Sequence, residues 1–505
     1  MSFHREILAG LNVKVSRLVA DSRAVRPGDT FVACPGEKTD GRQFIAQAIA
    51  QGANAVIWEA QHFAWNSEWQ LPNVAVNDLR HKAGWLADAV TGSPSEKLWM
   101  VGITGTNGKT STCHWISRCL NEAGKKCALM GTLGNGFYGA LQPTANTTPD
   151  VIRVHGLLAE YLQEGAFAVA MEVSSHALVQ GRVNGVRFDV ALLTNLSRDH
   201  LDYHGDMESY AASKRKLFDW QHLKFAVINL DDDFGAELAE NLQGTVEVIG
   251  YGLTDGALQL AERLGLRMVY GHLAAMSGQG LQLDIHSSWG SARLESPLVG
   301  RFNAANLLGT LAVLLVSDIN LNDAVASLGR LQAVTGRMQR ISDALQPTVI
   351  VDYAHTPDAL EKVLLSLREA GAASGGKLIC VFGCGGDRDR GKRAMMGVVA
   401  ERFSDLCIVT SDNPRSENPQ DIIADIVSGM AAENHEIIVN RAAAIERAIG
   451  LAKQEDTVLV AGKGHEEYQE VNGVRYPFSD AEAVKQVLQV WQTVQAGKAG
   501  PGGAK

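Results

Sequence analysis

The fold of this chain is indicated most clearly by residues 98–124, which read LWMVGITGTNGKTSTCHWISRCLNEAG. The apolar run 98–104 is typical of a buried strand, and a helical pattern extends from the glycine-rich turn to Gly124. Backbone N–H groups in such a turn, together with the positive end of the following helix, bind phosphate. The stretch therefore predicts a nucleoside triphosphate site in a mostly parallel α/β sheet.

The turn departs from the strict P-loop pattern G-x-x-x-x-G-K-[ST] at one position, because Ile103 stands where the first glycine is expected. Lys109 still offers a mobile charge to a phosphate, and the hydroxyl of Thr110 is suited to Mg²⁺. A glycine-rich turn with an incidental lysine is the alternative, but the flanking strand and helix favour phosphate binding. The predicted nucleotide contacts are Gly105, Thr106, Asn107, Gly108, Lys109, Thr110 and Ser111.

Similar alternations of strand and helix on both sides of this stretch predict an α/β protein of three domains. In the first block, strand-like runs at 29–36 and 53–60 enclose a helical pattern, and a polar segment at 91–97 ends the block. A restart of the pattern at 348 predicts a C-terminal Rossmann-like, doubly wound sheet after the central P-loop sheet. The expected boundaries are 1–97, 98–338 and 339–495, followed by a disordered tail at 496–505.

The composition excludes several classes of protein. With 46 basic and 56 acidic residues among 505, the net charge of −10 is opposite to that of a typical nucleic-acid-binding protein, so no nucleic acid partner is expected. The longest apolar run, 307–316, is half as long as a membrane span, so no membrane insertion is expected. The seven cysteines contain no C-x-x-C pair, which predicts a reducing, cytoplasmic location.

Polar side chains follow two of the apolar runs in the central block. Glu172 lies in the run 167–173, and His200 follows the run 190–196. Because the carboxyl ends of neighbouring parallel strands converge on one crevice, both side chains are candidates for a magnesium site near the P-loop. Magnesium prefers oxygen ligands, so a hydrogen-bonded core or surface position stays open for His200. Lys214, within SKRK, is typical of a solvated basic helix face.

Ten short segments, in order along nearly the whole chain, resemble those of the Mur ligases. They are DSR at 21–23, GTNGKTS at 105–111, NTTPD at 146–150, EVSSHALVQGRV at 172–183, TNLSRDHLDYHGDMESY at 194–210, GRMQ at 336–339, VDYAHTPDAL at 351–360, FGCGGDRDRGKR at 382–393, SDNPR at 411–415 and AGKGHEEYQ at 461–469. In that family the first domain holds a uridine nucleotide, the central domain ATP and the third an amino acid. The resemblance implies the same division here, in a chain expected to be a monomer.

The resemblance is to the members of this family that use meso-diaminopimelate. It implies an ATP-dependent carbon–nitrogen ligase of peptidoglycan precursor synthesis. The enzyme would add meso-diaminopimelate to the D-glutamyl γ-carboxylate of UDP-N-acetylmuramoyl-L-alanyl-D-glutamate through an acyl phosphate. The implied partners are the UDP-muramoyl dipeptide, ATP and meso-diaminopimelate, with Mg²⁺ as cofactor. Since no side chain need form a covalent intermediate, positioning and electrostatics would supply the rate.

The family's functional positions fall on particular residues of this sequence. The implied metal ligands are Thr110, Glu172, His200 and Lys214, the last as a carbamylated lysine (N6-carboxylysine) rather than a solvated one. The implied catalytic residues are Lys109, Glu172, His200, Lys214 and Arg337, with Asn306, Asp352 and His355 around the nucleotide. The implied contacts to the UDP-linked substrate are Ser22, Glu37, Lys38, Thr39, Asn146, Thr147, Thr148, Ser174, Gln180 and Arg182.

The segment Asp412-Asn413-Pro414-Arg415 bears on the choice of amino acid. A guanidinium group pairs well with a carboxylate, and the distal end of meso-diaminopimelate carries a carboxylate that lysine lacks. With Arg388, Gly462 and Glu466, this segment is expected to form the diaminopimelate pocket. A simple turn with a solvated Arg415 is the alternative.

Three alternative functions are each disfavoured by a particular feature of the sequence. A lysine-adding ligase of the same family is disfavoured by Arg415. A folylpolyglutamate synthetase would share the P-loop domain but would need neither the first block nor the DNPR segment. A non-catalytic nucleotide-binding regulator would bind ATP without releasing phosphate, and the many charged groups at predicted strand ends argue against it.

Overall fold

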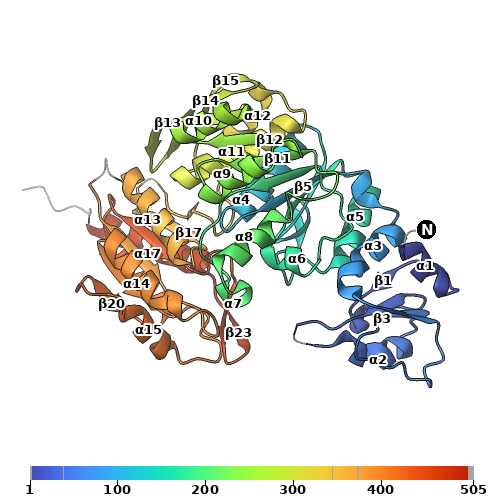
Figure 1. Cartoon of the computed structure of the whole chain (residues 1–505). Helices are drawn as coiled ribbons and strands as arrows, with labels where there is room; N and C mark the ends of the chain where they lie inside the picture. Colours follow the sequence, from blue (N-terminus) through green and yellow to red (C-terminus); the bar gives the residue numbers. More distant parts are fainter. Residues whose placement is uncertain (1–2, 38, 344, 372–374, 499–505) are drawn as a thin grey trace, which may run out of the picture.

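The computed structural model describes residues 3–37, 39–343, 345–371 and 375–498, and it contains three large sheets and one hairpin (Figure 1). Each large sheet draws its strands from one part of the chain. The α/β fold class expected from the sequence, with a central P-loop sheet and a C-terminal doubly wound sheet, is confirmed.

The N-terminal unit is a parallel sheet of four strands in the order β1-β2-β3-β4. Its core lies on both faces of the sheet and includes Phe31, Val56 and Leu86. The elements are α1 (Phe3–Gly10), β1 (Leu18–Val19), β2 (Thr30–Ala33), α2 (Ile45–Ala50), β3 (Ala55–Glu59), β4 (Asn73–Val76) and α3 (Leu79–Thr91), with short 3₁₀ turns at Ser22–Ala24, Gly41–Phe44 and Pro94–Glu96.

The central unit has eleven strands in the order β15-β14-β13-β12-β11-β10-β5-β9-β6-β7-β8. The strands from β13 to β6 in this order are parallel, and antiparallel hairpins extend both edges. Its strands are β5 (Trp99–Thr104), β6 (Cys127–Gly131), β7 (Gly134–Phe137), β8 (Ala140–Gln142), β9 (Ala168–Glu172), β10 (Val190–Leu193), β11 (Phe225–Asn229), β12 (Glu247–Gly252), β13 (Arg267–Ser277), β14 (Gly280–Ser287) and β15 (Gly290–Ser296).

Helices cover both faces of the central sheet. Helix α11 is apolar around most of its circumference because it is buried between α4 and the sheet, which explains the longest apolar run of the sequence. The helices are α4 (Lys109–Glu122), α5 (Val151–Gln163), α6 (Ser175–Val179), α7 (Leu201–His204), α8 (Met207–Arg215), α9 (Asp233–Asn241), α10 (Asp255–Leu264), α11 (Arg301–Val316) and α12 (Leu321–Gly329).

The C-terminal unit has six strands in the order β16-β17-β21-β18-β19-β20, parallel except for the pair β16–β17. Helices α13, α14 and α15 cover one face, and α16 and α17 the other. The elements are β16 (Gln339–Arg340), β17 (Thr348–Asp352), α13 (Pro357–Gly371), β18 (Leu378–Phe382), α14 (Gly391–Phe403), β19 (Leu406–Val409), α15 (Pro419–Val427), β20 (His435–Ile437), α16 (Arg441–Leu451), β21 (Thr457–Ala461), β22 (Tyr468–Val471), β23 (Val474–Pro477) and α17 (Asp480–Lys498).

The end of the chain differs in part from the expected tail at 496–505. Helix α17 continues to Lys498, three residues beyond the expected end of the third domain, and residues 499–505 lie outside the described ones. Within the described ranges, no helix is both long and apolar enough to cross a membrane.

Candidate active site between the central and C-terminal units

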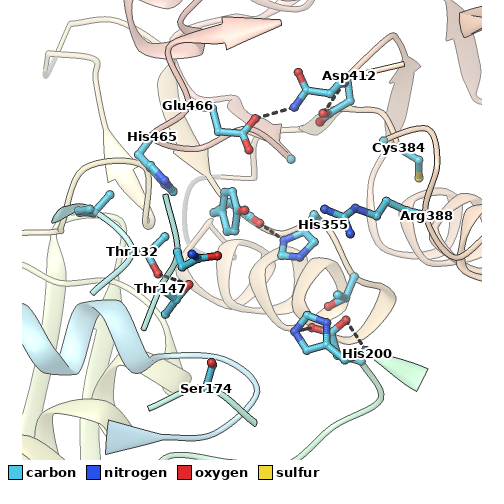
Figure 2. Close-up of a pocket in the computed structure, with 18 of the residues that line it drawn as sticks. Thr132, Thr147, Ser174, His200, His355, Cys384, Arg388, Asp412, His465 and Glu466 are labelled. Atoms are coloured by element: carbon cyan, nitrogen blue, oxygen red, sulfur yellow. Dashed lines mark hydrogen bonds and ion pairs between the residues drawn. The ribbon is translucent and has the colours of Figure 1, made fainter. Parts of the chain in front are cut away.

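A cavity of about 1450 Å³ lies between the central unit and the C-terminal unit. Thr132, Ser174 and His200 reach it from the central unit, and Arg388 and Glu466 reach it from the C-terminal unit (Figure 2). These residues follow the carboxyl ends of strands in two different sheets, which is where parallel α/β sheets bind ligands. The cavity is therefore the place where two substrates can be brought together.

The P-loop connects β5 to α4 and is packed tightly against its neighbours. Gly105 has a φ of +145°, and a Cβ atom there would lie 1.9 Å from Oγ1 of Thr194, so only glycine fits. Gly108 has a φ of +88° and lies against Asn306, so both predicted nucleotide contacts are neighbours in the structure. Nζ of Lys109 donates hydrogen bonds of 2.8 Å to the carbonyl groups of Gly105 and Thr106. Lys109 thus folds back over the loop.

Three further P-loop residues, Thr106, Asn107 and Ser111, are held by hydrogen bonds or by burial. Thr106 donates through its backbone N–H to Asn195 O at 2.9 Å, and Asn107 donates from its side chain to Asp358 of the C-terminal unit at 3.2 Å. Ser111 is buried in the first turn of α4. The loop is therefore held by the segment after β10 and by α13, as well as by its own turn.

Two oxygen donors for a cation lie side by side behind the P-loop. The hydroxyl of Thr110 donates to Glu172 Oε2 at 2.9 Å, and Glu172 Oε1 accepts the backbone N–H of Thr132 at 2.8 Å. A single carboxylate with a hydroxyl is a minimal protein site for Mg²⁺, which usually takes its other ligands from phosphate and water. Accordingly, the described residues contain no group of three or more His, Cys, Asp or Glu side chains that is arranged to hold a metal.

His200 directly precedes the short helix α7 at the edge of the same cavity. Its φ of +54° is unusual for a residue other than glycine, and such backbone strain is concentrated at functional sites. Burial lowers the pKa of His200 to about 4, although Asp199 lies 3.4 Å from Nε2. The imidazole is therefore neutral at physiological pH, with a lone pair available to a ligand.

Lys214 is buried at the C-terminal end of α8. Nζ donates to the carbonyl of Gly105 at 2.8 Å and lies 4.5 Å from the ring centroid of Tyr210. Burial, and then the charge of Lys109, lower the pKa of Lys214 well below its usual value. The interpretation of SKRK as a solvated basic face is therefore wrong for this lysine, which is only 1% exposed.

Arg337 approaches the site from the segment that joins the two units. Its Nη2 donates to Oγ1 of Thr110 at 3.3 Å, and the guanidinium lies 4.4 Å from the ring centroid of Tyr353. Asp352 accepts backbone N–H groups of Met338 and Ala354 at 2.6 and 2.7 Å, so it holds the joining segment. His355 lines the cavity itself.

The loops expected to hold the UDP-linked substrate meet beside Glu172. Thr148 donates to the carbonyl of Glu172 at 2.8 Å, and Arg182 donates to the carbonyl of Thr148 at 2.9 Å. Asn146, Thr147, Ser174 and Arg182 line the cavity. Gln180 donates to the hydroxyl of Tyr203, at 3.2 Å, and to Glu37 of the N-terminal unit.

The other expected uridine contacts lie in the N-terminal unit, away from the residues that line the cavity. Ser22 donates to Gln47 Oε1 at 2.9 Å, and the carbonyl of Thr39 accepts the N–H of Gly36 at 2.9 Å. Glu37 is also 3.6 Å from Arg80. Lys38 lies outside the described residues.

The expected diaminopimelate pocket is formed by the loops after β18, β19 and β21. Asn413 and Lys463 donate to Glu466 Oε2 at 2.7 and 3.0 Å, so a second carboxylate oxygen remains for an incoming ammonium group. Arg415 has a φ of +50° and donates to the carbonyl of Gly386 at 2.7 Å. Among the expected residues, those that line the cavity are Arg388, Asp412, Asn413, Arg415, Gly462 and Glu466, whereas Pro414 accepts the N–H of Glu417.

Three residues of the site were not singled out from the sequence. Thr132 binds Glu172 through both its N–H and its hydroxyl, and Asn195 accepts the N–H of Asn107. Lys463 is fully buried against Glu466. Each follows a strand, at the same edge as the predicted residues, so a systematic reading of strand ends would have found them.

Comparisons with known proteins agree along the whole chain. Family models described as "Mur ligase family, catalytic domain", "Mur ligase middle domain" and "Mur ligase, glutamate ligase domain" match residues 14–91, 103–314 and 336–464. A relative from Chromobacterium violaceum, named UDP-N-acetylmuramoyl-L-alanyl-D-glutamate--2,6-diaminopimelate ligase, is 53% identical over 490 residues, which is 96% of each chain. A relative of the same name from Nitrosomonas europaea is 50% identical over 493 residues, covering 95% of this chain and 94% of the other.

A solved structure leads to the same family. Its title gives the same ligase name, and it is 36% identical to this chain with a TM-score of 0.67, covering 95% of this chain and 96% of its own. The resemblance noted in the short sequence segments thus extends to the full length and to the fold. The chain belongs to the Mur ligase family.

Proposed function

We propose that this chain is an ATP-dependent ligase that joins meso-diaminopimelate to the D-glutamyl γ-carboxylate of UDP-N-acetylmuramoyl-L-alanyl-D-glutamate. One observation carries the proposal: a single cavity has the substrate loops beside Glu172 on one side and a pocket with Arg388, Arg415 and Glu466 on the other. The acyl donor, which is the UDP-linked substrate, and an amino acid with a second carboxylate would meet there. Membership of the Mur ligase family and the names of the full-length relatives support the same reaction.

The residues of the phosphate side have separate tasks. Lys109 and the backbone of the P-loop bind the terminal phosphates, and Arg337 reaches the same oxygens from the joining segment. Thr110 and Glu172 would hold Mg²⁺, with His200 at the edge of the site. Bound there, the ion would offset the negative charge that develops during phosphoryl transfer.

The γ-carboxylate of the substrate would accept the phosphoryl group, and the resulting acyl phosphate would lie in the cavity facing Glu466. The amine of diaminopimelate then attacks the acyl carbon and displaces phosphate, while its proton leaves to solvent. No side chain forms a covalent bond in this scheme, so the chain acts by holding the reacting atoms together.

Lys214 does not fit a cation site as an ammonium group, because two positive charges would repel each other. Carbamylation would resolve this: the neutral amine bonds to the carbon of carbon dioxide and loses a proton, which leaves an anionic carboxylate at Nζ. Its burial and the absence of an ion pair to Lys214 among the described residues support this proposal. Mass spectrometry of the intact protein would test it. The wild-type mass should exceed the sequence mass by one carbon dioxide, and the Lys214→Arg variant should lack this increase.

In this proposal each of the three domains binds one substrate. Residues 1–97 hold the uridine nucleotide, 98–338 hold ATP and 339–495 hold the amino acid. We place the enzyme in the cytoplasm as a monomer, where ATP is available. Analytical ultracentrifugation of the purified chain would test the monomer.

The central test is phosphate release from ATP and Mg²⁺ with the UDP-muramoyl dipeptide, comparing meso-diaminopimelate with L-lysine at equal concentrations. Release that depends on diaminopimelate supports the proposal. A preference for lysine would contradict the assigned amino acid, and ATP binding without release would favour a regulator. Release with a folate substrate in place of the UDP-linked one would favour a folylpolyglutamate synthetase.

A further inference from the structure

An ion-pair network around the buried Arg393 lies behind the two arginines of the amino-acid pocket. Arg393, on α14, is fully buried and donates from Nη2 and Nη1 to the two carboxylate oxygens of Glu417, at 2.7 and 2.9 Å. Nη1 also donates to Asp425 of α15 at 2.8 Å. Glu417 lies two residues after Arg415, and its carboxylate binds α14, the helix that follows the loop with Arg388. It therefore connects the two loops of the pocket.

Glu417 also holds the loop that carries Arg388. Its Oε1 accepts the backbone N–H of Asp387 at 2.6 Å, and Oε2 accepts Nη2 of Arg390 at 3.1 Å. Asp387 has a φ of +55° and accepts the hydroxyl of Ser416 at 2.6 Å. The chain is thus fixed on both sides of Arg388, whose guanidinium points into the cavity (Figure 2).

The loop that carries Arg415 is joined to the first loop by hydrogen bonds to the backbone of Gly386. Gly386 donates to the carbonyl of Asn413 at 2.9 Å, and Arg415 donates from Nη1 to the carbonyl of Gly386 at 2.7 Å. The N–H of Glu417 closes the turn on Pro414 at 3.0 Å. One carboxylate therefore ties the backbone positions of both arginines together.

We propose that Arg393 and Glu417 are a positioning pair that sets the spacing of Arg388 and Arg415, and that this spacing selects amino acids with a distal carboxylate. Arginine side chains are long and flexible, so two of them bind one carboxylate well only when their backbones are fixed beforehand. Two residues with positive φ in these loops, Asp387 and Arg415, need such support to persist. The inference rests on the proposed function and deepens its substrate choice.

The test is Glu417→Gln, which keeps the shape of the side chain but removes its charge. We expect the KM for meso-diaminopimelate to rise about tenfold, because a charge-assisted contact is weakened. The kcat at saturating diaminopimelate, the KM for ATP and the weak use of L-lysine should stay unchanged, since none of them needs a distal carboxylate. Glu436→Gln, which removes the partly exposed partner of Arg447 in the same unit, is the matched control and should leave the KM unchanged.

An unchanged KM for diaminopimelate, or an equal loss with diaminopimelate and L-lysine, would overturn the inference and indicate a purely structural pair. If Glu417→Gln does not fold, Ser416→Ala decides by the same criterion, because it removes only the exposed hydroxyl that binds Asp387. A wild-type enzyme that does not turn over diaminopimelate rejects the proposed function. In that case, the affinity for diaminopimelate of wild type and Glu417→Gln is measured by calorimetry. Equal affinities would reject the positioning role of Arg393 and Glu417.

Discussion

Two buried basic side chains of this protein differ in their surroundings, because one has an acidic partner and the other has none among the described residues. Arg441, in the C-terminal unit, donates to both oxygens of the buried Asp480 at 2.7 Å. Lys214, in the central unit, donates to a backbone carbonyl, and no ion pair to it occurs among the described residues. An unpaired buried charge destabilises a fold, whereas a paired one is tolerated. The difference agrees with the proposed functional role of Lys214 and indicates a structural role for Arg441.

The largest effect is expected for Lys214→Met. The phosphate-release rate should fall about a thousandfold, because an electrostatic group beside the P-loop is lost. The midpoint of thermal unfolding should stay the same or rise, since replacing a buried charge by an apolar group of similar volume is often neutral or stabilising. Lys216→Met, two residues away on the exposed side, is the control for both measurements. A destabilised variant with normal activity would make Lys214 structural after all.

Asp480→Asn tests the other side of the comparison. It leaves Arg441 buried without a counter-charge, so the free energy of unfolding should fall by about 3 kcal/mol. Activity per folded molecule should change little, because neither residue lines the cavity. Urea denaturation and phosphate release at low temperature would measure the two quantities. Loss of activity without loss of stability would contradict the structural role of this pair.

Arg415→Ala is expected to have a smaller effect, on specificity alone. The preference for meso-diaminopimelate over L-lysine should fall about thirtyfold, which corresponds to the loss of one charge-assisted hydrogen bond. The ratio of kcat/KM values for the two amino acids measures it. Arg475→Ala changes another arginine that lines the same cavity, and an equal loss there would mean that general positive charge, not Arg415, selects the substrate.

The smallest effect concerns acid pH and the pair Arg393–Glu417. Hydrogen bonds from Arg393 lower the pKa of Glu417 to about 2, from an ordinary value of 4.5. Because the folded-state pKa is the lower one, the carboxylate's contribution to stability is fully present above pH 4.5 and is lost as the pH falls toward 2. The difference in thermal midpoint between wild type and Glu417→Gln should therefore be constant from pH 7 to 4.5 and shrink below. A difference that grew in acid would contradict this assignment.

Much of the fold follows from local patterns. The strand–loop–helix unit at 98–124 appears as β5, the P-loop and α4, and the restart of the pattern at 348 corresponds to the start of β17. Local patterns succeed here because parallel strands buried on both faces are almost continuously apolar. The antiparallel hairpin strands β13, β14 and β15 were not predicted, since their alternating burial leaves a weaker signal in the sequence.

The candidate site is less accessible to local reading. Glu172 and His200 were placed near the P-loop from their positions after strands, and they do lie at that edge of the sheet. Asp352 was expected at the nucleotide, which stays a prediction, and its side chain accepts backbone hydrogen bonds of the joining segment, which no local pattern indicated. The assignments of individual ligands to residues stay predictions until a complex is measured.

By itself, the sequence determined the α/β class, the P-loop and the edge of each sheet where ligands bind, because these depend on patterns within about 30 residues. Only the tertiary structure decided that Lys214 is buried against Gly105 rather than solvated within SKRK, and that Arg393 and Glu417 tie two pocket loops together. Burial and ion pairing depend on which distant segments become neighbours. A basic side chain therefore reads the same in the sequence whether its charge is exposed, paired or left alone in the core.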